Sequence, residues 1–231
     1  MLSADQLTFF EREGYLVIED VFDQATIVDP VRAEYSQLLN SLYLEWFRQG
    51  HVKTAPDGLS FEDKLSISYQ AGCDWFQPMD ISLPGDRIQF DTPMHFGPAI
   101  FDLVTNSRLL DLVEDLIGPE ITSNPIQHVR IKPPSGDLQS DEIRAHVTVT
   151  DWHQDRAVAL EEADQTNMIT VWCAITDATV ENGCLQVIPR GHTEGMKPHC
   201  PRKQTAIAEG QIDTDVMLRP DLERGQARTL N

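Results

Sequence analysis

Hydrophobic positions recur at helical spacing in the first half of the chain. Ser3 and Gln6 have the spacing of a capping box, and Gly14 stands where a helix C-cap is expected, so a short opening helix is predicted. The apolar run 15–18 that follows is short enough for a buried strand. Pro30 suits the first turn of a second helix that extends to about residue 49, and its apolar face is predicted to consist of Leu38, Leu39, Leu42 and Phe47.

The pattern weakens between residues 50 and 98. Glycine, proline, serine and aspartate interrupt short apolar pieces there without a sustained period, so this segment is predicted to be mostly loop. A loop of this length in a compact domain is usually either functional, such as a lid over a site, or mobile, and both alternatives stay open at this point. A helical pattern returns from about Asn106 to Ile117 and is closed by Gly118 and Pro119.

Beyond Pro119 the chain changes to short apolar and β-branched segments that are separated by turn residues. Such segments are typical of strands, and no long helical pattern interrupts them. This favours an antiparallel sheet, sandwich or barrel behind a helical N-terminal layer over a parallel α/β fold. The predicted strands are 121–124, 127–132, 146–150, 168–176 and 184–188.

The net charge limits the possible binding partners but does not indicate a fold. Acidic residues outnumber basic ones 37 to 18, which gives a formal net charge of −19. A negative field of this size repels phosphate backbones and anionic headgroups, so no nucleic-acid partner is expected. The chain shows no basic leader before a long apolar run and no apolar stretch of about 18 residues, so we expect a cytoplasmic protein without a membrane span. The oligomeric state is left open.

The cysteines are widely spaced, at positions 73, 173, 184 and 200, which favours reduced, buried thiols over a disulfide framework. A structural zinc site is one alternative, because Cys184, His192, His199 and Cys200 lie close together in sequence. Their spacing argues against it, since no Cys-x-x-Cys pair is present and the adjacent His199 and Cys200 would diverge on a strand.

The stretch Asp151-Trp-His-Gln-Asp155 carries the main candidate chemistry. Residues two apart in an extended strand point to the same face, so the His153 imidazole and the Asp155 carboxylate can converge on one ion, while Gln154 points to the other face. An imidazole and a carboxylate are two of the three ligands in the facial triad of non-haem Fe(II) oxygenases. A His-x-Asp pair is also common by chance, so this motif alone leaves an ordinary surface pair open.

Three further motifs surround this stretch. Lys132-Pro133-Pro134 precedes it, and it is followed by the segment 169–176 with Trp172 and by Glu-Asn-Gly-Cys-Leu-Gln-Val-Ile-Pro-Arg-Gly-His at 181–192. This succession resembles the phytanoyl-CoA dioxygenase family, and the resemblance covers most of the chain, including the opening helix. Arg190 stands where that family usually has glycine, which suggests a shifted turn. His192 belongs, by the resemblance, to this turn and is not a metal ligand.

The resemblance implies a fold and a reaction. The fold would be α+β or mainly β, with a cupin-like jelly-roll core, or double-stranded β-helix, behind N-terminal helices. Residues 1–231 would form one domain, with a helical layer and loops in 1–118 and jelly-roll strands in 119–200. The reaction would be that of an Fe(II)- and 2-oxoglutarate-dependent dioxygenase that hydroxylates a C–H bond of a small molecule or lipid, with ascorbate as a candidate stimulant.

The resemblance also implies roles for single residues. His153 and Asp155 would be the iron ligands. His128 and Trp172 would line the 2-oxoglutarate pocket, although a hydrogen-bonded strand histidine and a core aromatic remain open as their alternatives. Asp155 fills the position that related halogenating enzymes leave vacant for chloride, so hydroxylation is preferred over halogenation.

The third ligand has no counterpart in this sequence. In the resembling family it is a histidine on a late strand, followed by an arginine that binds the far carboxylate of 2-oxoglutarate. Here the histidines end at His199, and the arginines that remain lie in a segment with little strand character: Arg219, Arg224 and Arg228. We therefore expect missing C-terminal strands, poor packing in 201–231 and weak or absent activity of this chain alone. The alternative is a non-catalytic jelly-roll binding protein or an inactive fragment.

Overall fold

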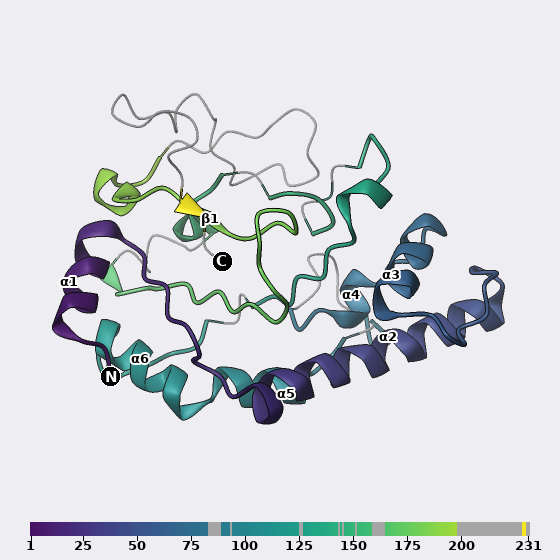
Figure 1. Cartoon of the computed structure of the whole chain (residues 1–231), viewed down its shortest axis with the longest axis horizontal. Helices are drawn as coiled ribbons and strands as arrows, with labels where there is room; N and C mark the ends of the chain where they lie inside the picture. The colour runs from purple at the N-terminus through teal and green to yellow at the C-terminus, as the bar shows by residue number, and fades with distance from the viewer. Residues whose placement is uncertain are drawn as a thin grey trace.

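The computed structural model describes residues 1–82, 89–92, 94–124, 127–142, 144, 146–150, 152–158, 165–197 and 228–229. The helices α2, α5 and α6 lie along one side of the molecule, and the extended segments of the second half lie above them (Figure 1). The α-helices are α1 (Ala4–Glu13), α2 (Asp29–Gln49), α3 (Phe61–Gln70), α4 (Phe76–Met79), α5 (Pro98–Val104) and α6 (Ser107–Ile117). Short π- or 3-10-helical turns occur at Gln24–Val28, Ser135–Asp137, Asp155–Val158 and Gly191–Glu194.

Helix α1 has the two caps that the sequence predicts. The Ser3 side chain accepts a hydrogen bond from the Gln6 backbone, and the Gln6 side chain accepts one from the Ser3 backbone. Gly14 ends the helix with φ at 79°, in the left-handed region that favours glycine. The following segment 15–18 forms no strand, so that part of the prediction is wrong.

Helix α2 begins one residue before Pro30 and ends at Gln49, as predicted. Its buried residues recur every four positions, at Val31, Tyr35, Leu39 and Tyr43. The predicted apolar face is rotated relative to the face that the helix buries, because Leu38 and Leu42 are only partly buried at the edge of the core. Helix α6 also agrees with the prediction, with Asn106 as its N-cap and Gly118 after its last turn.

The prediction of loop between residues 50 and 98 is wrong for two segments, α3 and α4. Ser60 and Asp63 form a capping box at the start of α3. Polar residues interrupt the buried face of this helix, which hides its apolar period in the sequence. Ser68 is fully buried, and Lys64 is buried with its Nζ donating to the Leu59 carbonyl oxygen at 2.9 Å.

The main core lies where the helical layer meets the extended segments. It is formed by Val31, Tyr35, Leu39, Leu65, Tyr69, Trp75, Met79, Ile100, Leu103 and Val147. Val129 and Ile131 from one extended segment and Cys173 and Ile175 from another pack against it. Trp75 also donates its indole N–H to the Ile131 carbonyl oxygen at 3.3 Å. The helices therefore hold in place the segments that carry the candidate chemistry.

Strand pairing is sparse in the part of the chain that the structure describes. The two strands there, β1 (Gln186–Val187) and β2 (Arg228–Thr229), form an antiparallel pair with Gln186 opposite Thr229. β1 falls inside the predicted strand 184–188, whereas residues 146–147 form a turn and the described parts of the other predicted strands have no backbone ladder. The jelly roll therefore stays a prediction. The expected poor packing of 201–231 lies outside the described residues, apart from the β2 backbone.

Candidate metal centre

His153 and Asp155 meet. The His153 Nε2 atom lies 3.0 Å from Asp155 Oδ1, and the two side chains are 40% and 49% exposed. The sequence predicts this convergence from a regular strand, but the chain instead bends at residue 152 and enters a 3-10 turn at Asp155. The pair therefore comes together through a turn, on a face that solvent can reach.

Thr170 holds the second oxygen of the same carboxylate. Its Oγ1 donates to Asp155 Oδ2 at 2.7 Å, across 15 positions of the chain. The hydrogen bond from His153 is the main cause that lowers the pKa of Asp155 below its ordinary value, and burial acts against it while Thr170 adds to it. Asp155 is therefore a fixed carboxylate at neutral pH. Sequence reasoning missed Thr170, although it lies two positions before Trp172 and thus on the same face of an extended segment.

The separation of the two side chains fits a shared ion. Ligand atoms at about 2.1 Å from a metal and at right angles to each other are about 3.0 Å apart, which is also the length of a hydrogen bond. A neutral imidazole and a carboxylate are donors that suit Fe(II). Within the described residues, no group of three or more His, Cys, Asp or Glu side chains gathers at one point. The donor set thus fits two positions of a facial triad.

Hydrogen bonds fix the chain on both sides of the pair and between its two members. Gln154, between the two candidate ligands, donates to the Gly195 carbonyl oxygen at 3.0 Å and accepts from the Lys197 backbone at 2.7 Å. Lys132 donates from Nζ to the Thr148 carbonyl oxygen at 2.5 Å and to Thr150 Oγ1 at 3.2 Å. The stretch is therefore bonded to the segment that follows the 181–192 motif, and Lys132 is bonded to residues that precede the stretch.

His128 is oriented by a buried carboxylate. Its Nδ1 lies 2.8 Å from Asp80 Oδ2, and Asp80 is fully buried. Asp80 also accepts hydrogen bonds from the backbones of Ile81 and Val129 and from the Ser82 hydroxyl. Burial would raise the pKa of Asp80, but these bonds and His128 outweigh it and lower the pKa. The sequence carried no signal for Asp80, which lies in the segment that was predicted to be loop.

Trp172 lies on the outer face of its segment. It is 46% exposed, whereas its neighbours Cys173 and Ile175 pack against the core. An aromatic side chain in the core would be much less exposed. Trp172 shares its face with Thr170, which contacts Asp155. The roles of His128 and Trp172 in binding 2-oxoglutarate stay predictions.

The other histidines contact different parts of the molecule. His192 Nε2 lies 3.0 Å from the Glu11 carbonyl oxygen, at the end of α1. His95 pairs with Glu34 at 2.7 Å, and His146 stacks on Phe76 with ring centroids 4.1 Å apart. Of the zinc alternative, His199 and Cys200 lie outside the described residues. Burial raises the pKa of the Cys173 thiol to about 11.

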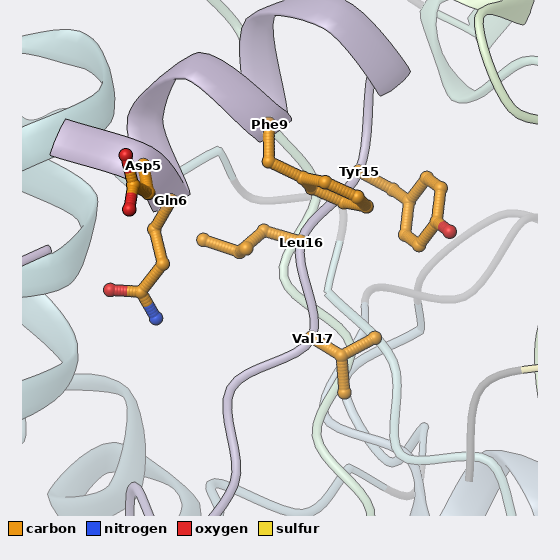
Figure 2. Close-up of a pocket in the computed structure, with 6 residues that line it drawn as sticks. All are labelled: Asp5, Gln6, Phe9, Tyr15, Leu16 and Val17. Atoms are coloured by element: carbon orange, nitrogen blue, oxygen red, sulfur yellow. The ribbon is translucent and has the colours of Figure 1, made fainter. Parts of the chain in front are cut away.

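Two surface hollows lie apart from the pair. Figure 2 shows the larger one, about 400 Å³, between α1 and the segment that follows it, with Phe9, Tyr15 and Leu16 among its walls. The smaller hollow, about 120 Å³, is lined by side chains that include Ile81, Phe101 and Gln127. Ile81 and Gln127 are the chain neighbours of Asp80 and His128, so the smaller hollow adjoins that pair. No described helix is long and apolar enough to cross a membrane.

Known proteins resemble this chain along most of its length. A family model described as phytanoyl-CoA dioxygenase (PhyH) matches residues 10–227. The chain is 26% identical over 196 residues to the phytanoyl-CoA dioxygenase domain-containing protein 1 homolog of Caenorhabditis elegans, which covers 80% of this chain and 63% of that protein. It is 25% identical over 206 residues to the phytanoyl-CoA dioxygenase of Arabidopsis thaliana, with 84% and 66% covered.

A third relative is the peroxisomal phytanoyl-CoA dioxygenase of Homo sapiens, which is 24% identical over 199 residues, with 86% of this chain and 50% of that protein covered. The chain therefore spans between half and two thirds of the length of these three relatives. The name of the human relative includes a peroxisomal location, so a cytoplasmic location of this chain stays a prediction. No solved structure matches the chain.

Proposed function

This chain belongs to the phytanoyl-CoA dioxygenase family, and on that premise we propose that it is an Fe(II)- and 2-oxoglutarate-dependent oxygenase. The observation that carries the proposal is the contact of His153 Nε2 with Asp155 Oδ1 at 3.0 Å. When bound, the iron would supply the oxidative chemistry, in which 2-oxoglutarate, O2 and a C–H bond of a small molecule or lipid yield succinate, carbon dioxide and a hydroxylated product, with one oxygen atom of O2 in succinate and the other in the product.

The side chains of the pair would hold the ion. His153 would bind the ion through Nε2 as a neutral imidazole, with its remaining proton on Nδ1, and Asp155 would bind it through Oδ1. Thr170 keeps its hydrogen bond to Oδ2 and so fixes the orientation of the carboxylate. The half-exposed position of both side chains leaves one side of the ion open to substrates.

Trp172 and His128 would form walls of the 2-oxoglutarate pocket. Trp172 faces the same side as Thr170, and its ring can exclude water from the ion without a hydrogen bond of its own to 2-oxoglutarate. Asp80 accepts from His128 Nδ1, which leaves Nε2 as the ring nitrogen available to a ligand. Asp80 acts through His128 and is therefore a positioning residue.

Release of succinate from 2-oxoglutarate tests this function, because it needs no primary substrate. Because two potential ligands and not three converge among the described residues, the full chain should release succinate only slowly when Fe(II) and ascorbate are added in air, and Asp155→Ala should lose at least 90% of that rate. Trp172→Ala should raise the KM for 2-oxoglutarate and should have little effect on the melting temperature. Asp102→Ala removes an exposed carboxylate on α5 and serves as the matched control, with an unchanged rate.

A non-catalytic binding protein is the second candidate. The observation that favours it is that, among the described residues, two potential ligands converge and not three. Such a protein would bind 2-oxoglutarate or a related acid without releasing succinate at any concentration of Fe(II). Succinate formation that depends on Asp155 excludes this candidate, whereas saturable binding without succinate formation excludes the oxygenase.

A further inference from the structure

Three basic side chains share one face of the extended segment 127–132. Along this segment exposure alternates: Val129 and Ile131 pack against the core, while His128, Arg130 and Lys132 are exposed. This alternation has the two-residue period of an extended chain. We call these three residues the basic stripe. Such a concentration of basic groups is unexpected in a chain with a net charge of −19.

The Arg130 side chain is held in place without being neutralised. Its guanidinium carbon lies 5.7 Å from the centre of the Phe76 ring, and the same ring stacks on His146. Within the described part of the chain, Arg130 forms no ion pair and no side-chain hydrogen bond. Arg144 shows the contrast, because Glu142 accepts bonds from its Nε and from a terminal nitrogen at 2.9 and 2.7 Å.

Lys132 lies next to Arg130 on the same face and also lacks an acidic partner among the described residues. Its ammonium group is bound by two neutral oxygens, the Thr148 carbonyl and Thr150 Oγ1. Thr150 is three residues before His153, so this ammonium group lies beside the segment that leads into the candidate metal centre. Partial burial of the ammonium group and, to a lesser degree, the charge of Arg130 lower the pKa of Lys132, although the side chain as a whole is exposed.

Asp80 is the carboxylate that acts on Arg130, but it cannot occupy the donors of Arg130. It is fully buried, and its two oxygens already accept four hydrogen bonds. The stripe therefore keeps a positive charge and several unused N–H donors on an outward face. A guanidinium and an ammonium group side by side are the donors that bind carboxylates and phosphates in proteins.

We propose that Arg130 and Lys132 form a binding site for an oxyanion, a carboxylate or phosphate group carried by a substrate of the His153–Asp155 centre. That the bound molecule is a substrate of the His153–Asp155 centre rests on the proposed function, whereas the anion site itself rests on the basic stripe. The oxyanion has two sources, the cosubstrate 2-oxoglutarate and an anionic group of the primary substrate. In either case the stripe would anchor one end of the molecule, and the bond from Lys132 to Thr150 ties the stripe to the segment that leads to His153.

Calorimetric titration of the metal-free full chain at low ionic strength tests the anion site, with inorganic phosphate and succinate as probes in separate arms. At least one probe should bind saturably. Arg130→Gln and Lys132→Met should each weaken that binding at least tenfold, because each removes charge-assisted donors. Arg108→Gln and Lys53→Met, which remove exposed cations elsewhere, should leave the affinity unchanged. Arg130→Lys keeps the charge and should retain more affinity than Arg130→Gln.

Competition then separates the two sources. Displacement of the probe by 2-oxoglutarate assigns the site to the cosubstrate, and simultaneous binding assigns it to the primary substrate. Equal affinity in the wild type and both stripe variants overturns the proposal, as does the absence of saturable binding of either probe. Should Arg130→Gln unfold, Lys132→Met carries the test. Titration with Fe(II) alone keeps the two hypotheses apart, because stripe variants should bind Fe(II) like the wild type, and failure to bind Fe(II) counts only against the proposed function.

Discussion

Arg190 has a backbone φ of 64°, in the left-handed region where side chains with a Cβ are strained. Its backbone N–H donates to the Glu13 carbonyl oxygen at 2.7 Å, which fixes this conformation at the end of α1. The family usually has glycine at this position, and the backbone gives the physical reason. The turn keeps the shape that suits glycine although the residue is arginine.

Arg190→Gly should therefore stabilise the protein by about 1 kcal/mol, the strain of a left-handed residue less the added chain entropy of glycine. Urea unfolding at equilibrium measures this difference. Arg190→Ala removes the side chain but keeps the Cβ, so it should leave the free energy of unfolding nearly unchanged. A gain that is equal in both variants would show that the side chain, and not the backbone, is the cause.

Glu142 is a second residue whose surroundings affect stability, through a lowered pKa. Hydrogen bonds from the Arg144 side chain are the main cause that lowers its pKa from 4.5 to about 2, and the Tyr69 hydroxyl adds a further bond at 3.1 Å. The lowered pKa means that the unfolded chain takes up the proton more readily. The stabilisation is therefore complete above about pH 4.5 and is lost as the pH falls toward 2.

Glu142→Gln should flatten the loss of stability between pH 5 and 2, as followed by urea unfolding at a series of pH values. Near neutral pH the variant should be the less stable one, because the charge-assisted bonds to Arg144 are weakened. Glu120→Gln, which removes an exposed carboxylate, should keep the wild-type slope. Identical slopes for Glu142→Gln and the wild type would rule out the ion pair as a source of acid sensitivity.

Local spacing predicts some residues of the site and not others. His153 and Asp155 are two positions apart, so their convergence could be predicted from any extended backbone, and a turn produced it instead. Asp80 contacts His128 across 48 positions and Thr170 contacts Asp155 across 15. Contacts of this kind depend on the tertiary packing of segments, which single-sequence patterns do not contain.

At the scale of elements, α1 is bonded to the turn that follows β1. A Cβ on Gly14 would overlap the His192 ring, and His192 itself contacts the Glu11 carbonyl oxygen. Gly14 also has a positive φ of 79°. Glycine is thus required twice at this junction, for the backbone conformation and for the close approach of the imidazole. The junction ties the N-terminal helix to the segment 190–197, whose end binds Gln154.

Gly14→Ala should destabilise the protein by about 1–2 kcal/mol from the backbone alone, and by more because of the overlap with His192. Adding His192→Ala should remove the destabilisation that comes from the overlap and leave the destabilisation that comes from the backbone conformation. Thermal and urea unfolding of the two single variants and the double variant form a cycle that separates the parts. If the double variant is as unstable as the two losses added together, the close approach of Gly14 and His192 is wrong.

Elements with caps and an uninterrupted period were predictable, and the others were not. α1, α2 and α6 have both signals. α3 has a capping box at its start, but Lys64 and Ser68 break its apolar face, so the sequence pattern indicates a loop. The segment 15–18 has the composition of a strand, yet a strand also needs a partner backbone at ladder distance, and in the structure this segment runs beside a helix and a surface hollow.

At the scale of the molecule, a helical layer supports extended segments that carry the chemistry on their outward side. Val129, Ile131, Cys173 and Ile175 point toward the helices, so the alternate residues are presented on the opposite side. His128, Arg130, Trp172 and the pair His153 and Asp155 all have exposed side chains or lie on exposed faces. The metal pair, the residues of the predicted 2-oxoglutarate pocket and the basic stripe are therefore all accessible from solvent.

The central claim is that His153 and Asp155 together bind Fe(II), and anaerobic titration of the full chain with Fe(II) tests it most directly. The wild type should bind one ion per chain. Asp155→Ala should weaken binding at least tenfold while the apo protein keeps its circular dichroism, because the carboxylate is half-exposed and contributes little to packing. Asp102→Ala should bind like the wild type. Equal affinities of the wild type and Asp155→Ala would contradict the claim.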